Sequence, residues 1–200
     1  MLIKIYDKNP NENSVRTVVE SLNNDGIIVY PTDSVYALGC SIRSLKAIDQ
    51  LKKISGKQKE LTIVCPDLST IADYAKVDNQ TFKLLKRNLP GPFTLILNAS
   101  SRVPNKFFDK RKTVGVRLQS NAVAQAIICE LGVPMVSVSI HTEEKETEYM
   151  TDPELIHERY GKIVDIVVDG GIGEIIPTTV VDCTTPNPEI IRQGQGEFIL

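Results

Sequence analysis

Hydroxyl and guanidinium side chains gather on one face of each of two expected strands, residues 113–118 and 135–140. Side chains alternate between the two faces of a strand, so every second residue shares a face. The residues on these two polar faces are Thr113, Gly115, Arg117, Ser137, Ser139 and, just beyond the second strand, His141. A guanidinium binds a carboxylate or phosphate through paired hydrogen bonds, and the glycine leaves room for a ligand to approach the sheet. We therefore expect a surface for a polar ligand; the alternative is that both faces are exposed to solvent.

A short polar loop, residues 31–36 (PTDSVY), directly follows a third expected strand. Its hydroxyl and carboxylate groups stand at a strand end, where they can hold a small polar substrate. The same groups can instead satisfy the backbone of their own turn, which would make the loop structural. The sequence leaves both interpretations open.

Positive charge is concentrated in two segments, 43–59 and 102–117, within a chain of uneven charge. Residues 1–142 carry 19 Lys and Arg against 12 Asp and Glu, whereas residues 143–200 carry 4 against 13. The basic residues of the two segments are Arg43, Lys46, Lys52, Lys53, Lys57, Lys59, Arg102, Lys106, Lys110, Arg111, Lys112 and Arg117. Such clusters suit a triphosphate or RNA, and the alternative is a solvated surface. Aromatic residues are not interleaved with the lysines, which argues against a platform for single-stranded nucleic acid.

Several other chemistries have no support in the sequence. It lacks the phosphate loop G-x-x-x-x-G-K-[ST], the dinucleotide fingerprint G-x-G-x-x-G and the nucleophile elbow G-x-S-x-G. The 4 cysteines have no C-x-x-C spacing and there are only 2 histidines, so we expect no metal site and no disulfide framework. No apolar run approaches the ~20 residues that span a bilayer, and the first residues do not resemble a secretory signal. We expect a cytoplasmic protein without a membrane partner.

Short apolar runs alternate with segments of helical period, which predicts an α/β fold in a single domain, residues 1–200. The expected strands are 2–6, 27–30, 61–65, 93–97, 113–118, 135–140, 163–168, 179–183 and 189–192. The expected helices are 14–23, 45–54, 68–74, 80–87, 122–131 and 153–160. Asn121 and Gly132 are expected to cap the helix between them. Because no helix separates the last three strands, we expect a mixed sheet flanked by helices. The polar segment 141–151 is expected to form a mobile loop.

Six segments together resemble the signatures of the YrdC/YciO family, the L-threonylcarbamoyladenylate synthases and their relatives. They are 31–39 (PTDSVYALG), 90–94 (PGPFT), 114–117 (VGVR), 134–139 (PMVSVS), 177–182 (PTTVVD) and 191–194 (IRQG). They occur in order over a core of about residues 14–196, nearly the whole chain.

The resemblance implies one domain with a twisted, mixed, open sheet and a concave cationic cavity. In the catalytic members of the family it implies binding of ATP, L-threonine and bicarbonate, with Mg²⁺ accompanying the nucleotide. Those members form threonylcarbamoyl-AMP and pyrophosphate, the first step towards the threonylcarbamoyladenosine modification of tRNA.

The resemblance also assigns roles by position. It places Thr32, Arg117 and Thr178 around L-threonine. Around the nucleotide it places Lys53, Thr113, Ser137, Ser139 and Arg192. It makes Arg117 and Lys53 the catalytic residues.

The chain departs from the synthases at four motif positions and is closer to the YciO branch. The K-x-R-P element of the synthases reads KISG at residues 53–56, and their S-x-N element reads SIH at residues 139–141. A histidine usual in the third strand is Cys65, and the signature glycine is Ala37. Two functions stay open: nucleotidyl transfer that forms threonylcarbamoyl-AMP or a related carbamoyl-adenylate, and binding of double-stranded RNA or tRNA without efficient catalysis.

Overall fold

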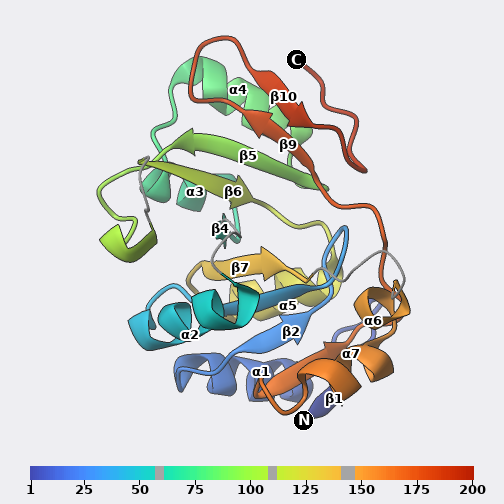
Figure 1. Cartoon of the computed structure of the whole chain (residues 1–200). Helices are drawn as coiled ribbons and strands as arrows, with labels where there is room; N and C mark the ends of the chain where they lie inside the picture. Colours follow the sequence, from blue (N-terminus) through green and yellow to red (C-terminus); the bar gives the residue numbers. More distant parts are fainter. Residues whose placement is uncertain (57–60, 108–111, 141–146) are drawn as a thin grey trace.

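The computed structural model describes residues 1–56, 61–107, 112–140 and 147–200 (Figure 1). The strands are β1 (Leu2–Lys4), β2 (Ile28–Tyr30), β3 (Ala37–Ser41), β4 (Thr62–Val64), β5 (Phe93–Asn98), β6 (Thr113–Arg117), β7 (Met135–Ser139), β8 (Ile166–Asp169), β9 (Thr179–Asp182) and β10 (Glu189–Arg192). The helices are α1 (Glu12–Asn23), α2 (Leu45–Ser55), α3 (Leu68–Tyr74), α4 (Asn79–Asn88), α5 (Ala122–Leu131), α6 (Glu148–Thr151) and α7 (Pro153–Tyr160), with a 3₁₀ turn at Asn105–Phe107.

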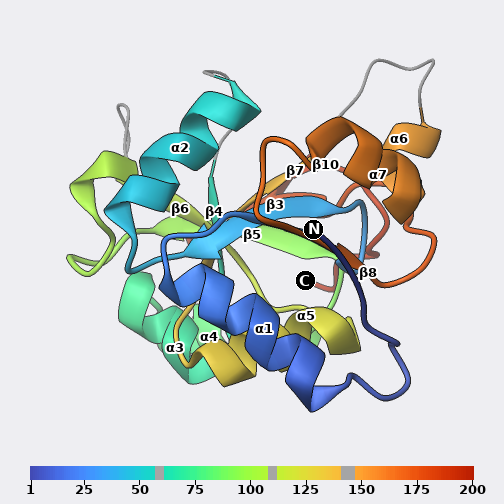
Figure 2. The same ribbon diagram turned by 90° about the horizontal axis from the view of Figure 1, so that it is seen from below.

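These strands form one ten-stranded sheet in the order β1-β8-β2-β3-β7-β4-β6-β5-β9-β10. The sheet contains parallel pairs such as β4–β6 and β5–β9 and antiparallel pairs such as β3–β7 and β5–β6. The expected mixed sheet is therefore confirmed. The sheet winds from β1 at the bottom of Figure 1 to β10 at the top. In Figure 2, helices α1, α3, α4 and α5 lie on one side of the strands and α2, α6 and α7 on the other. The expected α/β class with flanking helices is therefore also confirmed.

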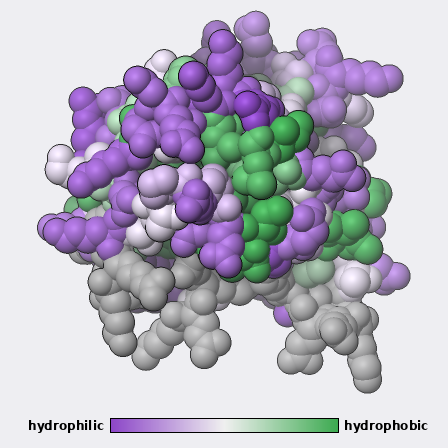
Figure 3. All heavy atoms as spheres, turned by 90° about the horizontal axis from the view of Figure 1, so that it is seen from above, coloured by the Kyte–Doolittle hydropathy of each residue, from purple (hydrophilic) through white to green (hydrophobic). Residues whose placement is uncertain are grey.

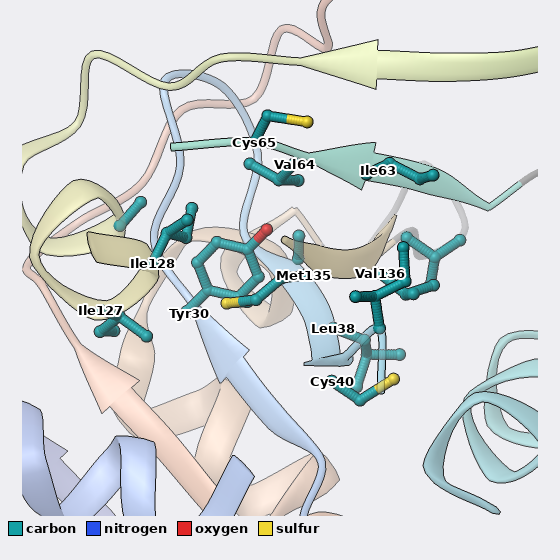
Figure 4. Packing of buried hydrophobic residues seen from close by; sticks show 14 of the residues in the cluster. Tyr30, Leu38, Cys40, Ile63, Val64, Cys65, Ile127, Ile128, Met135 and Val136 are labelled. Carbon is teal, nitrogen blue, oxygen red and sulfur yellow. The ribbon is translucent and has the colours of Figure 1, made fainter. Parts of the chain in front are cut away.

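Buried apolar side chains from both halves of the sheet form one continuous core. In the middle of that core the ring of Tyr30 lies beside Met135 and Ile128 (Figure 4). Gly39 faces the same ring, and a Cβ at this position would come within 2.8 Å of Tyr30 and 2.6 Å of Met135. A glycine is needed here because any side chain would collide with the core.

Both expected caps of α5 are confirmed. The Asn121 side chain accepts a hydrogen bond from the Ala124 amide at 3.0 Å, and Gly132 ends the helix in the left-handed conformation with φ 68°. At α1 the expected start at residue 14 is two residues late. Asn11 caps the Ser14 amide, so the helix begins at Glu12.

Strand β3 is absent from the sequence prediction, which assigned residues 37–39 only to a motif and gave residues 40 and 41 no element. All five residues of β3 are buried, and the strand pairs with β2 on one side and β7 on the other. A strand covered on both faces has no alternation of apolar and polar residues, so the period-2 pattern fails to reveal it.

The expected loop 141–151 is partly wrong, because α6 occupies its last residues. Residues 141–146 of that segment lie outside the described part of the chain. Among the described residues, no helix has the length and apolar character needed to cross a membrane.

Candidate substrate-binding site

The register of the sheet places the two polar faces side by side. β4 lies between β6 and β7, and Thr62 of β4 is in register with Gly115 on one side and Ser137 on the other. A Cβ at Gly115 would stand 3.0 Å from a methyl carbon of Thr62 and 3.1 Å from that of Thr94. The space over this glycine is therefore partly occupied by two threonine methyl groups, so it is tighter than the sequence suggested.

The residues of the two polar faces differ in how far they are buried. Arg117 and Ser137 are 2% and 0% exposed, whereas Thr113, Gly115 and Ser139 are half-buried. For Arg117 and Ser137 the alternative of a solvent-exposed face is wrong.

Arg117 ends β6 as a buried guanidinium. Its Nη2 donates to the hydroxyls of Thr32 and Ser34, each at the long distance of 3.4 Å. Its Nε has no hydrogen-bond partner among the described residues, and no acidic side chain in the described ranges forms an ion pair with it. A buried cation held this weakly is costly until an anion arrives.

The surroundings of Arg117 act on its charge. Burial lowers the pKa of this guanidinium; nearby Tyr30 and Asp33 oppose that shift, and the positive charge of Arg192 adds to it. Arginine stays protonated in proteins at physiological pH, so this side chain remains a cation. The net result is a positive, largely dehydrated point beside the hydroxyls of the loop at residues 31–36.

The loop satisfies part of its own backbone and also faces Arg117. The Thr32 hydroxyl donates to the Val35 carbonyl at 2.8 Å and accepts from the Ser34 amide at 3.1 Å. The structural interpretation therefore holds for Thr32, and its role in binding a substrate stays a prediction. Thr32 shapes the turn, and its oxygen also lies next to the buried guanidinium.

Asp33 fastens this loop to the start of α5. Its carboxylate accepts from the Ser120 amide at 2.8 and 2.9 Å, from the Ser120 hydroxyl at 2.8 Å and from the Asn121 amide at 2.5 Å. The Asp33 amide in turn donates to Oε1 of Gln119 at 3.0 Å. Gln119 is 1% exposed, and its Nε2 has no partner in the described chain.

Thr178 and Arg192 form a second group at the start of β9. The hydroxyls of Thr178 and Thr94 are hydrogen-bonded at 2.9 Å, and Nη2 of Arg192 donates to the Thr178 carbonyl at 2.9 Å. Thr178 is 4% exposed. Because Arg192 acts electrostatically on Arg117, the structure brings together Thr32, Arg117, Thr178 and Arg192 from separate parts of the chain.

Ser137 belongs to a buried network. Its hydroxyl accepts from the Tyr30 hydroxyl at 2.8 Å and donates to the Leu38 carbonyl at 3.1 Å. Burial raises the pKa of Tyr30, although the nearby Arg117 lowers it, so this phenol stays neutral. The Ser137 hydroxyl is thus already engaged inside the protein.

The other expected site residues have no described hydrogen bond or ion pair to the group of Thr32, Arg117, Thr178 and Arg192. Ser139 and Thr113 are half-buried near the ends of β7 and β6. Lys53 is exposed in the last turn of α2, and no hydrogen bond or ion pair among the described residues joins it to Arg117. His141 lies outside the described ranges.

Some cations of the two basic segments are already in ion pairs. Lys46 forms an ion pair with Asp25 at 3.7 Å, and Arg102 with Asp73 at 3.4 Å. Residues 57–60 and 108–111 of these segments fall in the gaps of the description. Across the described ranges, no cluster of three or more His, Cys, Asp or Glu could hold a metal ion.

Sequence reasoning missed three residues of the site: Ser34, Thr94 and Gln119. Ser34 and Thr94 lie within the motifs at 31–39 and 90–94 but were given no role. Gln119 continues the alternation of Gly115 and Arg117 beyond the end of β6, and that period was the signal that could have revealed it.

Comparison with known proteins gives consistent matches over nearly the whole chain. The model of the Sua5/YciO/YrdC family, described as "Telomere recombination", matches residues 20–194. The chain is 41% identical over 197 residues to the Escherichia coli K12 protein named "Uncharacterized protein YciO", covering 96% of this chain and 95% of that one. It is 28% identical over 187 residues to the threonylcarbamoyl-AMP synthase of Vibrio vulnificus YJ016, covering 90% and 98%.

Solved structures give the same picture of the fold. The crystal structure of E. coli YciO matches with a TM-score of 0.90 at 38% identity, over 100% of this chain and 99% of that one. The crystal structure of P. abyssi Sua5 complexed with L-threonine matches with a TM-score of 0.85 at 23% identity, over 97% of this chain and 57% of that one.

Proposed function

Because the chain belongs to the Sua5/YciO/YrdC family, we propose that it is an ATP-dependent nucleotidyltransferase. It would form L-threonylcarbamoyl-AMP, or a closely related carbamoyl-adenylate, from L-threonine, bicarbonate and ATP. The product would serve the threonylcarbamoyladenosine modification of tRNA. A relative that carries the name threonylcarbamoyl-AMP synthase supports the reaction class.

One observation carries this proposal: a buried, weakly bonded Arg117 beside two hydroxyls. The carboxylate of an amino acid would supply the negative charge and the acceptors that this guanidinium lacks. The hydroxyl of Thr32, next to the guanidinium, and that of Thr178, next to Arg192, would bind the rest of the amino acid. Threonine fits such a site because its own hydroxyl can exchange hydrogen bonds with theirs.

The reaction needs positioning and charge stabilisation rather than a covalent enzyme intermediate. The threonine amine and bicarbonate condense to a carbamate with loss of water. A carbamate oxygen then attacks the α-phosphorus of ATP, and the bond from that phosphorus to pyrophosphate breaks. Arg117 would orient the amino acid, and Arg192 would offset negative charge near the attacked phosphate.

The nucleotide would extend from Arg192 along the polar face, past Thr113 and Ser139 towards Lys53. Mg²⁺ would accompany the phosphates, bound by their oxygens and by water. Ser137 would contribute through its strand rather than its hydroxyl, which is already bonded to Tyr30.

The test is pyrophosphate release from ATP and bicarbonate, measured with and without L-threonine. We expect threonine-dependent release, and we expect Thr178→Val to reduce it at least tenfold. Thr17→Val is the matched control, because Thr17 bonds only within α1 to the Asn13 carbonyl.

Absence of threonine-dependent release from a folded protein would contradict the proposal. Binding of tRNA that weakens steeply with salt would then support the alternative of an RNA-binding protein without efficient catalysis.

A further inference from the structure

A separate cavity of about 770 Å³ lies between α4 and the segment that links β9 to β10. None of the residues proposed for threonine or nucleotide lines it. Asn98 lines this cavity, whereas Thr94, on the same strand, bonds Thr178 of the candidate site. Four residues of strand separate them by about 13 Å. The two locations are therefore opposite ends of β5.

The cavity has a positively charged wall. Lys76, Lys83 and Arg87 line it, and Asp78 is its single acidic side chain. No described Asp or Glu forms an ion pair with any of these three cations. Arg87 donates one hydrogen bond to the Leu200 carbonyl.

Asp78 adds one negative charge to this wall, and its carboxylate is fixed at the start of α4 as a helix cap. It accepts from the Thr81 amide at 2.7 Å, and this hydrogen bond lowers the pKa of Asp78. The carboxylate forms no ion pair with the described cations of the wall. Lys83 therefore keeps its charge for a ligand, and Arg87 keeps the N–H groups that it does not use for Leu200.

The opposite wall is held in place by hydrogen bonds. The Gln80 side chain donates to the Pro186 carbonyl at 3.3 Å, and the Asn98 side chain donates to the Thr184 carbonyl at 3.1 Å. These bonds join the 183–188 segment to α4 and to β5. The cavity therefore exists before any ligand binds, which lowers the cost of binding.

Apolar and hydrogen-bonding groups share the lining. The apolar members are Val77, Leu84, Cys183, Pro186, Pro188 and Leu200. Figure 3 views the molecule from the top of Figure 1, the side of α4 and β10, and there apolar surface lies among hydrophilic side chains. A cavity of this size with apolar walls and a few cations has the usual character of a small-molecule site.

We propose that this cavity binds a small organic anion, with its acidic group at Lys83 and Arg87 and its apolar body against Val77 and Leu84. The acidic group is a phosphate or a carboxylate, since both accept hydrogen bonds from these cations. This site does not depend on the proposed nucleotidyl transfer.

The test is an NMR titration of the ¹⁵N-labelled full chain at constant ionic strength. Phenyl phosphate is the probe in one arm and benzoate in the other. We expect saturable shifts of backbone amides at residues 76–87 and 183–188 with at least one probe. The arm with the tighter binding identifies the acidic group as phosphate or carboxylate.

Two single variants on the same helix decide between a site and a charged surface. Lys83→Ala should weaken binding by about tenfold, as expected for the loss of one charge-assisted hydrogen bond. Lys86→Ala should change it less than twofold, because Lys86 is equally exposed on α4 but does not line the cavity.

Equal weakening by both variants would mean attraction to general surface charge and would overturn the proposal. Shifts that do not saturate with either probe, or that centre on the residues around Arg117, would overturn it as well. Because the readout is binding rather than turnover, failure here leaves the test of the proposed function unaffected.

Discussion

Two cationic places in this molecule differ in how they hold their charge. Arg117 is buried, weakly hydrogen-bonded and without an ion pair to any described acidic side chain. Lys83 and Arg87 on α4 are exposed to water, which solvates their charge. A buried unpaired cation costs the fold several kcal/mol, whereas a solvated one costs almost nothing.

That difference indicates which place carries the stronger functional signal. A costly arrangement persists in a protein when it is useful, so the cost of Arg117 is itself an argument for a ligand. The cations beside α4 give no such argument by themselves, and the inference there depends on the shape and lining of the cavity. The predictions below test this contrast, in order of decreasing effect.

Replacing Arg117 with methionine gives the largest expected effect, and it acts in opposite directions on function and stability. Arg117→Met should reduce threonine-dependent pyrophosphate release by at least about 100-fold. Its free energy of unfolding in urea should be unchanged or higher, because an apolar side chain of similar volume replaces a poorly satisfied buried charge. If Arg117→Met lost stability as well as activity, the buried charge of Arg117 would not be costly to the fold. The contrast with the exposed cations of α4 would then disappear.

Asp33→Asn should destabilise the protein by about 1–3 kcal/mol, because an amide cannot accept all the hydrogen bonds that the carboxylate takes from Ser120 and Asn121. Urea denaturation measures this change. Asp78→Asn is the matched control and should be nearly neutral, since asparagine caps a helix as well as aspartate does. If both variants lose the same stability, Asp33 acts as an ordinary cap and does not fasten the loop.

Tyr30→Phe should cost about 1 kcal/mol of unfolding free energy, because it removes the hydrogen bond to Ser137 but leaves the Ser137–Leu38 bond intact. Thermal or urea unfolding checks this value. A loss of more than about 3 kcal/mol would contradict this prediction, because it exceeds what one neutral hydrogen bond contributes.

Lys83→Ala and Lys86→Ala should each change the free energy of unfolding by less than about 0.5 kcal/mol, because solvated surface cations contribute little to folding. Urea denaturation of the two variants in parallel checks this. A larger loss in Lys83→Ala alone would mean that the cavity wall is held together by this side chain, contrary to its exposure.

Most strands of the sheet could be predicted, because their sequences are either short apolar runs or alternate between apolar and polar residues. The sequence singled out Thr32, one of the two hydroxyls that bond Arg117, through a motif, but it gave no role to Ser34, the other one. It failed at β3, where burial on both faces removes the alternation. The limits of these elements depend on capping contacts such as that of Asn11, which a period does not reveal.

Long-range placement was harder to predict. Nothing local to Asp33 indicates that its carboxylate binds backbone amides nearly ninety residues away at Ser120 and Asn121. The cavity beside α4 was not predicted either, because its walls come from a helix and from a distant segment that meet only in the folded chain. The role of Lys53 at the nucleotide, which comes from its motif position alone, stays a prediction.

The order of strands has a consequence for a chain emerging from the ribosome. β8 lies between β1 and β2, so these two early strands have no common neighbour until residues 166–169 have been made. Thr178 and Arg192 come later still. Pairing between such distant segments is slow, and an incomplete chain exposes strand edges that can associate with other chains. A nascent chain that stalls before β8 therefore lacks a complete sheet and half of its candidate site. Such a chain is a natural client for a chaperone.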